Sequence, residues 1–569
     1  MNISWPRDRV FPQFSEPKQL EVVDLRTIDF RKNWRWLPLI ILQGLVNREE
    51  PRIYLLLSNR DLDLLKLIEK HAIKVIKSDL NEVFEKYIDY AKGYIVFDPD
   101  VPDTLNVANT LSGLVNAIVV SPIDIEWAEE QGLKCLEDFR GKFRSRLEVY
   151  EWAYRELWPK VDKRLLAPMK PCSDSRLLQI AFRDYVTATK IFAHYLDPRA
   201  PKERELFCSL LKEMPDNSAV LGWYEGSEHI TVRLASEYRK FVVVVTGSPF
   251  LTSNLTVWSG IRVECRYPLP PVDFSKLGKD KVYVTFYMND GDNIQWDFMM
   301  KDFWEDPDRG KIPIAWTISP FLKDLAPLIM KYYAETASSQ DTFVSGPSGA
   351  GYWYPNVNPD YVDTFLRMSR KYLEESGLKF TEILGEFLDG ESLPKYAETG
   401  LLAIKLGYRG MDIFPYHLKD SPVPVIPGAV EFWEGEEDKV YGWLKAIATV
   451  YKKRPLHALI ICVPWRYKTL KPLKIVADKL SSDEDFVLVN FHEFVAMLNP
   501  VYGLALCKKL LEETKKRKLP KEIVSEAESC ISRAEEFCSK KEWKEALNQV
   551  NKVYRLLGPR LFSAGETAV

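Results

Sequence analysis

The stretch VYVTFYMNDGDN, residues 282–293, decides the fold of the second half of the chain. Its first seven residues are almost all apolar, aromatic or β-branched, which is typical of a strand buried on both faces of a parallel sheet. Polar residues then follow at once around Gly291. An apolar strand that ends in a polar turn before a helix predicts the start of a β/α unit.

The same pattern recurs along residues 280–500. Apolar strand candidates lie at 282–288, 312–319, 341–346, 380–387, 410–416, 457–465 and 486–491, with a further candidate at 423–433. Segments whose apolar residues recur with helical spacing lie between most of these strand candidates. Seven such strands, or eight with the further candidate, predict a β/α barrel. The main alternative is a doubly wound open sheet, but no G-x-G-x-x-G turn follows the first strand and no P-loop occurs.

The N-terminal half carries a strand–helix–strand pattern three times, at residues 21–58, 93–122 and 218–247. Units of this kind favour parallel strand pairing with a right-handed crossover. We therefore predict that residues 1–270 form an α/β domain of three divergent βα repeats. Residues 124–215 read as mainly helical, and the Pro-bearing stretch 264–280 reads as a linker.

The end of the chain, residues 503–569, is amphipathic and breaks at Leu519-Pro520, which predicts a C-terminal helical hairpin. Packing against the barrel or self-association is the default role of such a hairpin, and partner binding is the alternative. The predicted domains are therefore 1–270, 280–500 and 503–569.

Composition and charge exclude several classes of function. The net charge is −3, from 78 basic and 81 acidic residues, without the basic excess of a nucleic-acid-binding surface. No run reaches the ~18 apolar residues of a membrane span. The N-terminus has no apolar leader, so we expect a cytoplasmic protein that binds neither nucleic acid nor membrane. The eight Cys form no C-x-x-C pair and the six His form no H-x-x-x-H pair, so we expect no metal and no cofactor.

Candidate site residues follow from the rule that barrel enzymes place reactive groups just beyond the C-terminal ends of their strands. Nearly every predicted strand end here carries a polar or aromatic group. The candidates at these ends are Asn289, Asp290, Asp292, Asn293, Glu386, Asp389, Trp465, Arg466 and His492.

Asp290 and Asp292 are the sharpest pair among them. Two carboxylates on either side of Gly291 can both face the barrel mouth, and close like charges raise one pKa, which suits proton transfer. The structural interpretation is a turn or a helix N-cap, which Asp and Asn both favour, and Asn293 is a further N-cap candidate. A metal site is a third interpretation, which the scarcity of His makes weak.

Residues 349–355, GAGYWYP, combine a Gly-rich turn with three aromatic residues. If Tyr352, Trp353 and Tyr354 are exposed, they offer flat faces on which a sugar ring can stack. The alternative is a loop that packs onto the barrel rim.

This segment matches the signature G-x-G-Y-x-Y-P. Together with VTFYMNDGDNIQW, IAWTISP and DTFVSGPSGAGYWYP, it resembles the GxGYxYP family of putative glycoside hydrolases, and the resemblance extends more loosely over residues 20–500. The resemblance implies a domain of three divergent repeats, then a seven-stranded β/α barrel, with a site in the cleft between them. It also implies an acidic triad of one Glu from the first domain and two Asp from the barrel, by analogy with inverting cellulases.

The two Asp of this triad correspond to Asp290 and Asp292, and the Glu corresponds to Glu228, with Glu225 as the alternative. The structural interpretation of Glu228 is a first-turn Glu that interacts with the helix dipole. The tail after residue 500 lies outside the resemblance. The family is linked to secreted polysaccharide breakdown, and because no leader is seen here, we expect an internal glycan or oligosaccharide as substrate.

The leading hypothesis is a glycosidase, in which Glu228 protonates the leaving oxygen and Asp290 or Asp292 activates a water molecule. Inversion is what the resemblance implies, and retention is the alternative. Residues expected to contact the sugar are Asn289, Asn293, Tyr352, Trp353, Tyr354, Glu386, Asp389, Trp465, Arg466 and His492. The alternatives are a non-catalytic carbohydrate-binding protein, a metal-dependent hydrolase at the acidic rim, and a scaffold that acts through its helical tail.

Overall fold

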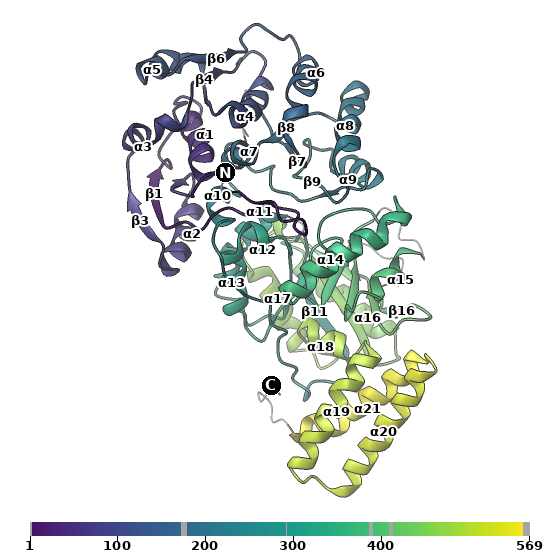
Figure 1. The fold of residues 1–569 in the computed structure, drawn as a ribbon. Helices are drawn as coiled ribbons and strands as arrows, with labels where there is room; N and C mark the ends of the chain where they lie inside the picture. Colours follow the sequence, from purple (N-terminus) through teal and green to yellow (C-terminus); the bar gives the residue numbers. More distant parts are fainter. Residues whose placement is uncertain (1–2, 172–178, 292, 386–390, 409–412, 562–569) are drawn as a thin grey trace.

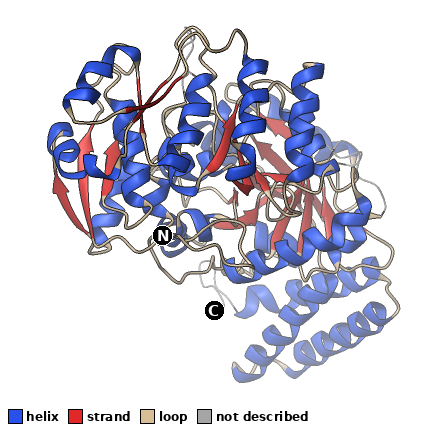
Figure 2. Cartoon of the chain, turned by 45° about the horizontal axis from the view of Figure 1, so that its top comes forward, coloured by secondary structure: helices blue, strands red, loops and turns tan. Residues whose placement is uncertain are grey.

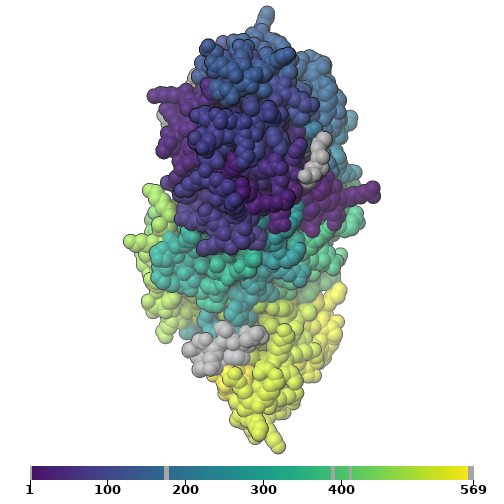
Figure 3. Space-filling model, turned by 60° about the vertical axis from the view of Figure 1, so that its left-hand side comes forward, coloured from purple at the N-terminus to yellow at the C-terminus, as the bar shows by residue number. Residues whose placement is uncertain are grey.

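A computed structural model describes residues 3–171, 179–291, 293–385, 391–408 and 413–561. Three parts follow one another along a long axis (Figures 1 and 3): an N-terminal part up to residue 270, a central part from 280 to 499, and a tail from Pro500. The tail lies at the end of the molecule opposite the N-terminal part. No helix in the described ranges is both long and apolar enough to cross a membrane.

The central part is built on one curled, mainly parallel sheet, whose strands appear as red arrows in Figure 2. Its strands are β11 Val282–Met288, β12 Ile314–Ile318, β13 Asp341–Ser345, β14 Phe380–Ile383, β15 Ala403–Leu406, β16 Tyr416–His417, β17 Pro424–Ile426, β18 Val430–Phe432, β19 Leu456–Cys462 and β20 Phe486–Leu488. The hydrogen-bonded order is β16-β17-β15-β14-β13-β12-β11-β19-β18, and β20 also pairs with β11. In the described ranges no strand ladder joins the two ends of this order.

The stretch that opened the sequence argument is β11, and all seven of its residues are buried. It pairs in parallel with three strands, β12, β19 and β20. A strand in this position has no polar face, which explains why its sequence is a continuous apolar run. It is therefore the most extensively paired strand of the curled sheet as described.

Helices cover the outside of the curled sheet (Figure 1). They are α11 Ile294–Trp304, α12 Leu322–Leu325, α13 Pro327–Glu335, α14 Val362–Ser376, α15 Ser392–Ala397, α16 Glu437–Val450, α17 Lys471–Ser481 and α18 Phe491–Ala496. α14 shows why they form: its apolar residues recur on one face, and the helix ends at Gly377, which adopts the left-handed conformation with φ 77°.

One predicted strand was wrong. The fifth strand is β15, Ala403–Leu406, and not residues 410–416, of which 410–412 lie outside the described residues and 416 begins β16. β15 is short and has Lys405 in its middle, a residue type that normally marks a solvent-facing position. Residues 423–433 contain two short strands, β17 and β18, which lie second from one end and at the other end of the sheet order.

The N-terminal part contains three small parallel sheets, with orders β2-β1-β3, β5-β4-β6 and β10-β9-β7-β8. Their strands are β1 Gln19–Asp24, β2 Ile53–Leu56, β3 Lys74–Lys77, β4 Tyr94–Val96, β5 Ile118–Val120, β6 Cys135–Asp138, β7 Asp162–Pro168, β8 Ile191–His194, β9 Ala219–Val220 and β10 Phe241–Val242. Each predicted strand–helix–strand stretch supplies one parallel pair, β1/β2, β4/β5 and β9/β10. Residues 124–215 are less helical than predicted, since β6, β7 and β8 lie there.

The helices of this part are α1 Trp36–Asn47, α2 Asn59–Lys70, α3 Leu80–Tyr87, α4 Thr104–Val115, α5 Ile125–Glu130, α6 Arg146–Glu156, α7 Arg183–Thr189, α8 Pro201–Glu213, α9 Glu228–Glu237 and α10 Leu255–Trp258. Every residue of α1 and of α7 is buried, so these two helices form the centre. They approach closely at Gly44, where an added Cβ would lie 2.4 Å from the Asp184 carbonyl oxygen.

The GAGYWYP loop joins the central part to the N-terminal part. Tyr352 and Val242 of β10 exchange two backbone hydrogen bonds, each 2.8 Å, in an isolated antiparallel bridge. Gly351 has φ 111°, and a Cβ there would lie 2.4 Å from the ring of Phe241. Gly351, the second Gly of the signature, is therefore required by the close approach of the two parts.

The tail is a bundle of three helices, not a hairpin: α19 Pro500–Lys516, α20 Lys521–Ser539 and α21 Trp543–Leu561 (Figure 1). The Pro520 break was predicted, whereas the turn between α20 and α21 at Lys540–Glu542 carries no Pro or Gly to mark it. α21 packs against the linker before the central part, where a Cβ on Gly558 would lie 2.1 Å from the Phe274 carbonyl oxygen.

Candidate functional site

A cavity of about 450 Å³ lies where the N-terminal part meets the C-terminal ends of the central strands. Residues from both parts form its wall: Trp223, Glu228, Asp290, Asn293, Tyr352, Leu384, Tyr408, Val463, Trp465 and Arg466. A volume of this size suits a small organic ligand. The cavity brings together Glu228 and Asp290, two of the three predicted catalytic carboxylates.

Asp290 lies two residues after the end of β11 and is half-buried. Its backbone is left-handed, with φ 73°, a conformation that Asp tolerates better than most residues and that persists only where the surroundings enforce it. The next residue must be Gly, because a Cβ on Gly291 would lie 2.3 Å from the backbone nitrogen of Ile318. Tight packing against β12 therefore holds Asp290 at the cavity.

The pKa of Asp290 is raised to about 6. Burial is the largest cause, and a hydrogen bond from the Tyr408 hydroxyl opposes it. The negative charges of Glu382 and Glu228 raise the pKa further, and a hydrogen bond from Trp465 lowers it. Asp290 therefore holds a proton up to a higher pH than an ordinary Asp, which is a property of groups that transfer protons.

Glu228 reaches the cavity from the first turn of α9. The Tyr352 hydroxyl donates a hydrogen bond of 3.1 Å to its Oε1. Tyr352 lies 3.3 Å from the Tyr354 hydroxyl, which is in turn 2.9 Å from His229 Nδ1. The signature tyrosines thus orient Glu228 by a chain of hydrogen bonds.

Glu225, the alternative to Glu228, lines a neighbouring cavity and forms a 2.6 Å ion pair with Lys170. It does not line the cavity that contains Asp290. The geometry therefore favours Glu228 over Glu225 as the partner of Asp290.

A fully buried ion pair lies beneath the cavity. Lys405 of β15 and Glu382 of β14 are 0% and 1% exposed, and Lys405 Nζ lies 2.8 Å from Glu382 Oε1. Lys405 also donates to Asn289 Oδ1 at 3.2 Å and to the Gly407 carbonyl at 2.9 Å. Asn289 precedes Asp290, and Gly407 precedes Tyr408. Through the Asn289 side chain and the Gly407 carbonyl, Lys405 thus contacts both segments that carry the Asp290–Tyr408 hydrogen bond.

Trp465 and Arg466, both predicted, lie at the open side of the cavity. Trp465 is 45% exposed, and its ring meets Trp296 edge to face with centroids 6.4 Å apart. The Arg466 guanidinium lies 4.4 Å from the ring centre of Trp433, which is also exposed. An exposed, braced indole beside two carboxylates is a suitable surface for the apolar face of a sugar.

The prediction that Trp353 is an exposed stacking surface was wrong. Its side chain is fully buried, packs on Phe365 at 4.5 Å between ring centres, and donates to the Tyr396 hydroxyl at 3.1 Å. Tyr354 is also buried and lines neither cavity; it acts on the site only through its hydroxyl. The packing interpretation of the loop therefore holds for these two residues, whereas Tyr352 does line the cavity.

His492 was also wrongly placed by the sequence argument. It is buried below the opposite end of the sheet, in α18, with Nδ1 2.7 Å from the Pro270 carbonyl oxygen and Nε2 2.6 Å from the Tyr502 hydroxyl. It joins the linker to the tail and does not line the site. The cause is that β20 pairs with the lower half of β11, at Val282–Val284, so its C-terminal end does not reach the rim.

Asn289 and Asn293 have structural partners. Asn289 is buried and bound by Lys405, so it lies behind the cavity. Asn293 is the N-cap of α11, accepting from the backbone nitrogens of Gln295 and Trp296, and it also lines the cavity. Asp292, Glu386 and Asp389 lie outside the described residues.

The sequence argument missed four residues of the cavity wall and the buried pair beneath it: Trp223, Leu384, Tyr408 and Val463, and Glu382 with Lys405. Trp223 stands beside the Glu225/Glu228 pair in GWYEGSE and could have been proposed as an aromatic neighbour. Tyr408 follows β15, which was missed as a strand. Among the described residues, no group of three or more His, Cys, Asp and Glu is placed to hold a metal ion.

Three segments of the chain match one protein family. Residues 280–499 match the GxGYxYP putative glycoside hydrolase C-terminal domain, residues 91–161 match the second domain of GxGYxYP_N, and residues 164–260 match the GxGYxYP third domain. These matches together cover more than half of the chain. No curated protein matches it.

Two solved structures are similar to the chain to very different degrees. The crystal structure of a putative hydrolase from Bacteroides thetaiotaomicron VPI-5482 is 25% identical, covers 87% of this chain and 98% of its own, and has a TM-score of 0.74. A putative polysaccharide deacetylase from Mycobacterium smegmatis is 12% identical over 41% of this chain and 95% of its own, with a TM-score of 0.31. The second score is too low to indicate a shared fold.

Replacing Lys405 by Met should lower the free energy of unfolding by about 3–5 kcal/mol, because Glu382 is left as a buried, unpaired charge. The double variant Lys405→Met/Glu382→Met should lose clearly less, since both charges are gone. Urea unfolding measures both. The exposed pair Lys540–Glu536 is the control, where Lys540→Met should cost less than about 1 kcal/mol. A double variant as unstable as the single one would contradict the proposed cause.

Trp353→Ala should cost about 3–5 kcal/mol of stability, because it opens a cavity in the core. Trp465→Ala should cost clearly less, about 1 kcal/mol, because its side chain is 45% exposed and its contact with Trp296 is edge to face. Chemical denaturation of the two variants side by side separates the packing residue from the surface residue. Equal losses would mean that Trp465 is a core residue too.

Proposed function

Since this chain belongs to the GxGYxYP family, we propose that it is a glycoside hydrolase that cleaves its substrate in the cavity between the N-terminal and central parts. The observation that carries the proposal is the convergence of Glu228 and Asp290 on one cavity. Two carboxyl groups with separate environments are what acid/base cleavage of a glycosidic bond requires. The exposed Trp465 at the same cavity supports a carbohydrate as substrate.

The raised pKa of Asp290 supports a specific division of roles. We propose that protonated Asp290 donates its proton to the leaving oxygen as the bond to the anomeric carbon breaks. Ionised Glu228, held by Tyr352, accepts a proton from the water that attacks this carbon. This assignment exchanges the roles that the sequence argument gave to the two residues. It implies inversion at the anomeric carbon, as expected from the family resemblance.

The decisive test is cleavage of a panel of oligosaccharides followed by product analysis. Asp290→Asn and Glu228→Gln should each reduce kcat by about 10²–10⁴-fold, because each removes one proton-transfer group, while both should keep the fold. Tyr502→Phe, far from the cavity, is the control and should retain full activity. Proton NMR of the first product anomer reports inversion or retention.

Two outcomes would contradict the proposal in different ways. If both carboxyl variants cleave as well as the natural protein, Glu228 and Asp290 are not the acid/base pair. If the natural protein and all three variants bind oligosaccharides and none of them cleaves these ligands, the chain is a carbohydrate-binding protein without catalysis.

The pH dependence of cleavage tests the role of Asp290. Activity that requires protonated Asp290 should fall as the pH rises through about 6. Tyr408→Phe removes a hydrogen bond that lowers this pKa, so the falling limb should move to higher pH by about one unit. Tyr502→Phe should leave the limb in place. If cleavage activity instead rises as the pH increases through about 6, ionised Asp290 acts as the base.

A further inference from the structure

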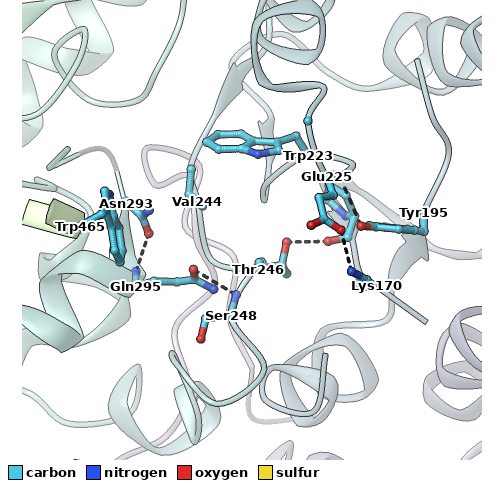
Figure 4. Close-up of a pocket in the computed structure, with 13 residues that line it drawn as sticks. Lys170, Tyr195, Trp223, Glu225, Val244, Thr246, Ser248, Asn293, Gln295 and Trp465 are labelled. Atoms are coloured by element: carbon cyan, nitrogen blue, oxygen red, sulfur yellow. Dashed lines mark hydrogen bonds and ion pairs between the residues drawn. The ribbon is translucent and has the colours of Figure 1, made fainter. Parts of the chain in front are cut away.

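A second cavity, of about 300 Å³ (Figure 4), lies next to the first one. Three residues line both cavities: Trp223, Asn293 and Trp465. The second cavity is otherwise enclosed by the N-terminal part and the start of α11, through Pro168, Lys170, Tyr195, Glu225, Gly226, Val244, Thr246, Gly247, Ser248 and Gln295. The two cavities are therefore neighbours, separated or joined at these three shared residues.

The walls of the second cavity are held in place before any ligand arrives. Gln295 is 4% exposed, accepts from the Ser248 backbone nitrogen at 3.3 Å, and donates to the Val245 carbonyl at 3.0 Å. The Thr246 hydroxyl donates to the Pro168 carbonyl at 2.5 Å. A preformed wall lowers the entropic cost of binding, as expected of a ligand site.

Charge and chemistry define the kind of ligand that fits. Lys170 and Glu225 neutralise each other across 2.6 Å, so the lining has no net charge to attract an ion. The remaining lining combines amide and hydroxyl side chains with the rings of Trp223, Trp465 and Tyr195. Polar groups that bind hydroxyls, placed beside aromatic faces, match a neutral sugar better than an anion or a purely apolar molecule.

We propose that this second cavity is a sugar subsite, which binds the part of a neutral oligosaccharide that extends beyond the cavity of Glu228 and Asp290. The proposal rests on the proposed function and deepens it: the substrate is a chain longer than a disaccharide, and the shared residues Trp223 and Trp465 stand where the chain passes from one cavity to the other. Binding energy gained in the second cavity is used to position the bond to be cleaved in the first.

The test compares chain lengths in a catalytically disabled protein. Cello-, malto-, xylo- and manno-oligosaccharides of two to six sugars are titrated calorimetrically into Asp290→Asn. Affinity for one series should rise about tenfold between the disaccharide and the longer chains, as one added aromatic contact supports. Ser248→Phe in the same background fills the second cavity and should abolish this rise, while disaccharide binding stays unchanged.

Two further variants guard against a merely misfolded protein. Ser248→Ala keeps the space and removes only one lining hydroxyl, so affinity should still rise with chain length, by less than in the parent. The charge-neutral pair Lys170→Met/Glu225→Gln removes polar groups of the second cavity only and should weaken the longer chains alone. If these substitutions affect short and long chains equally, or if no oligosaccharide binds, the subsite proposal is overturned.

The same experiment separates this proposal from the proposed function. Chain-length-dependent binding that Ser248→Phe abolishes, together with no cleavage by the natural protein, would support the subsite and refute the hydrolase. Cleavage that depends on Glu228 and Asp290 but shows no dependence on chain length would refute the subsite and support the hydrolase.

Discussion

The two backbone hydrogen bonds between Val242 and Tyr352 are the contact on which the arrangement of the site depends. Val242 ends the strand that directly follows α9, the helix whose first turn carries Glu228. Tyr352 belongs to the loop after β13, and its hydroxyl contacts Glu228. One short bridge therefore fixes both the distance between the two parts and the orientation of a carboxylate across the junction. The glycine of the signature permits it, because Gly351 lies against Phe241 with no room for a Cβ.

A second constraint acts from below, within the curled sheet. The buried Lys405–Glu382 pair is costly to desolvate, and its attraction offsets that cost only because Asn289 and the Gly407 carbonyl take further hydrogen bonds from the same ammonium group. These bonds converge on the two chain segments that carry Asp290 and Tyr408. Glu382 also adds negative charge near Asp290. The pair therefore shapes both the position of Asp290 and its proton affinity, without itself lining the cavity.

Sequence patterns predicted those features that follow from local periodicity. The run of apolar residues in β11, the strand–helix–strand stretches of the N-terminal part, and the polar turn at Asp290 all have this origin. Lys405 shows where the reasoning fails: a charged residue in a four-residue strand looks exposed until its partner, 23 residues away, is known. Trp353 and Trp465 show the same limit for aromatic residues, since only tertiary packing decides that one is fully buried and the other 45% exposed. His492 was misplaced because strand register sets which strand ends reach the rim, and register cannot be predicted from the periodicity of apolar residues.

The proton affinity of Asp290 is in this sense a property of the junction and not of the DGDN segment. Burial is its largest cause, and the N-terminal part lines the same cavity through Trp223 and Glu228. The charge of Glu228 acts on Asp290 only because the two parts are joined. A central part standing alone would expose Asp290 to water, return its pKa toward that of an ordinary Asp, and lose the second carboxylate. Under the proposed function, two parts that each look like a common α/β arrangement thus form an acid/base pair only where they meet.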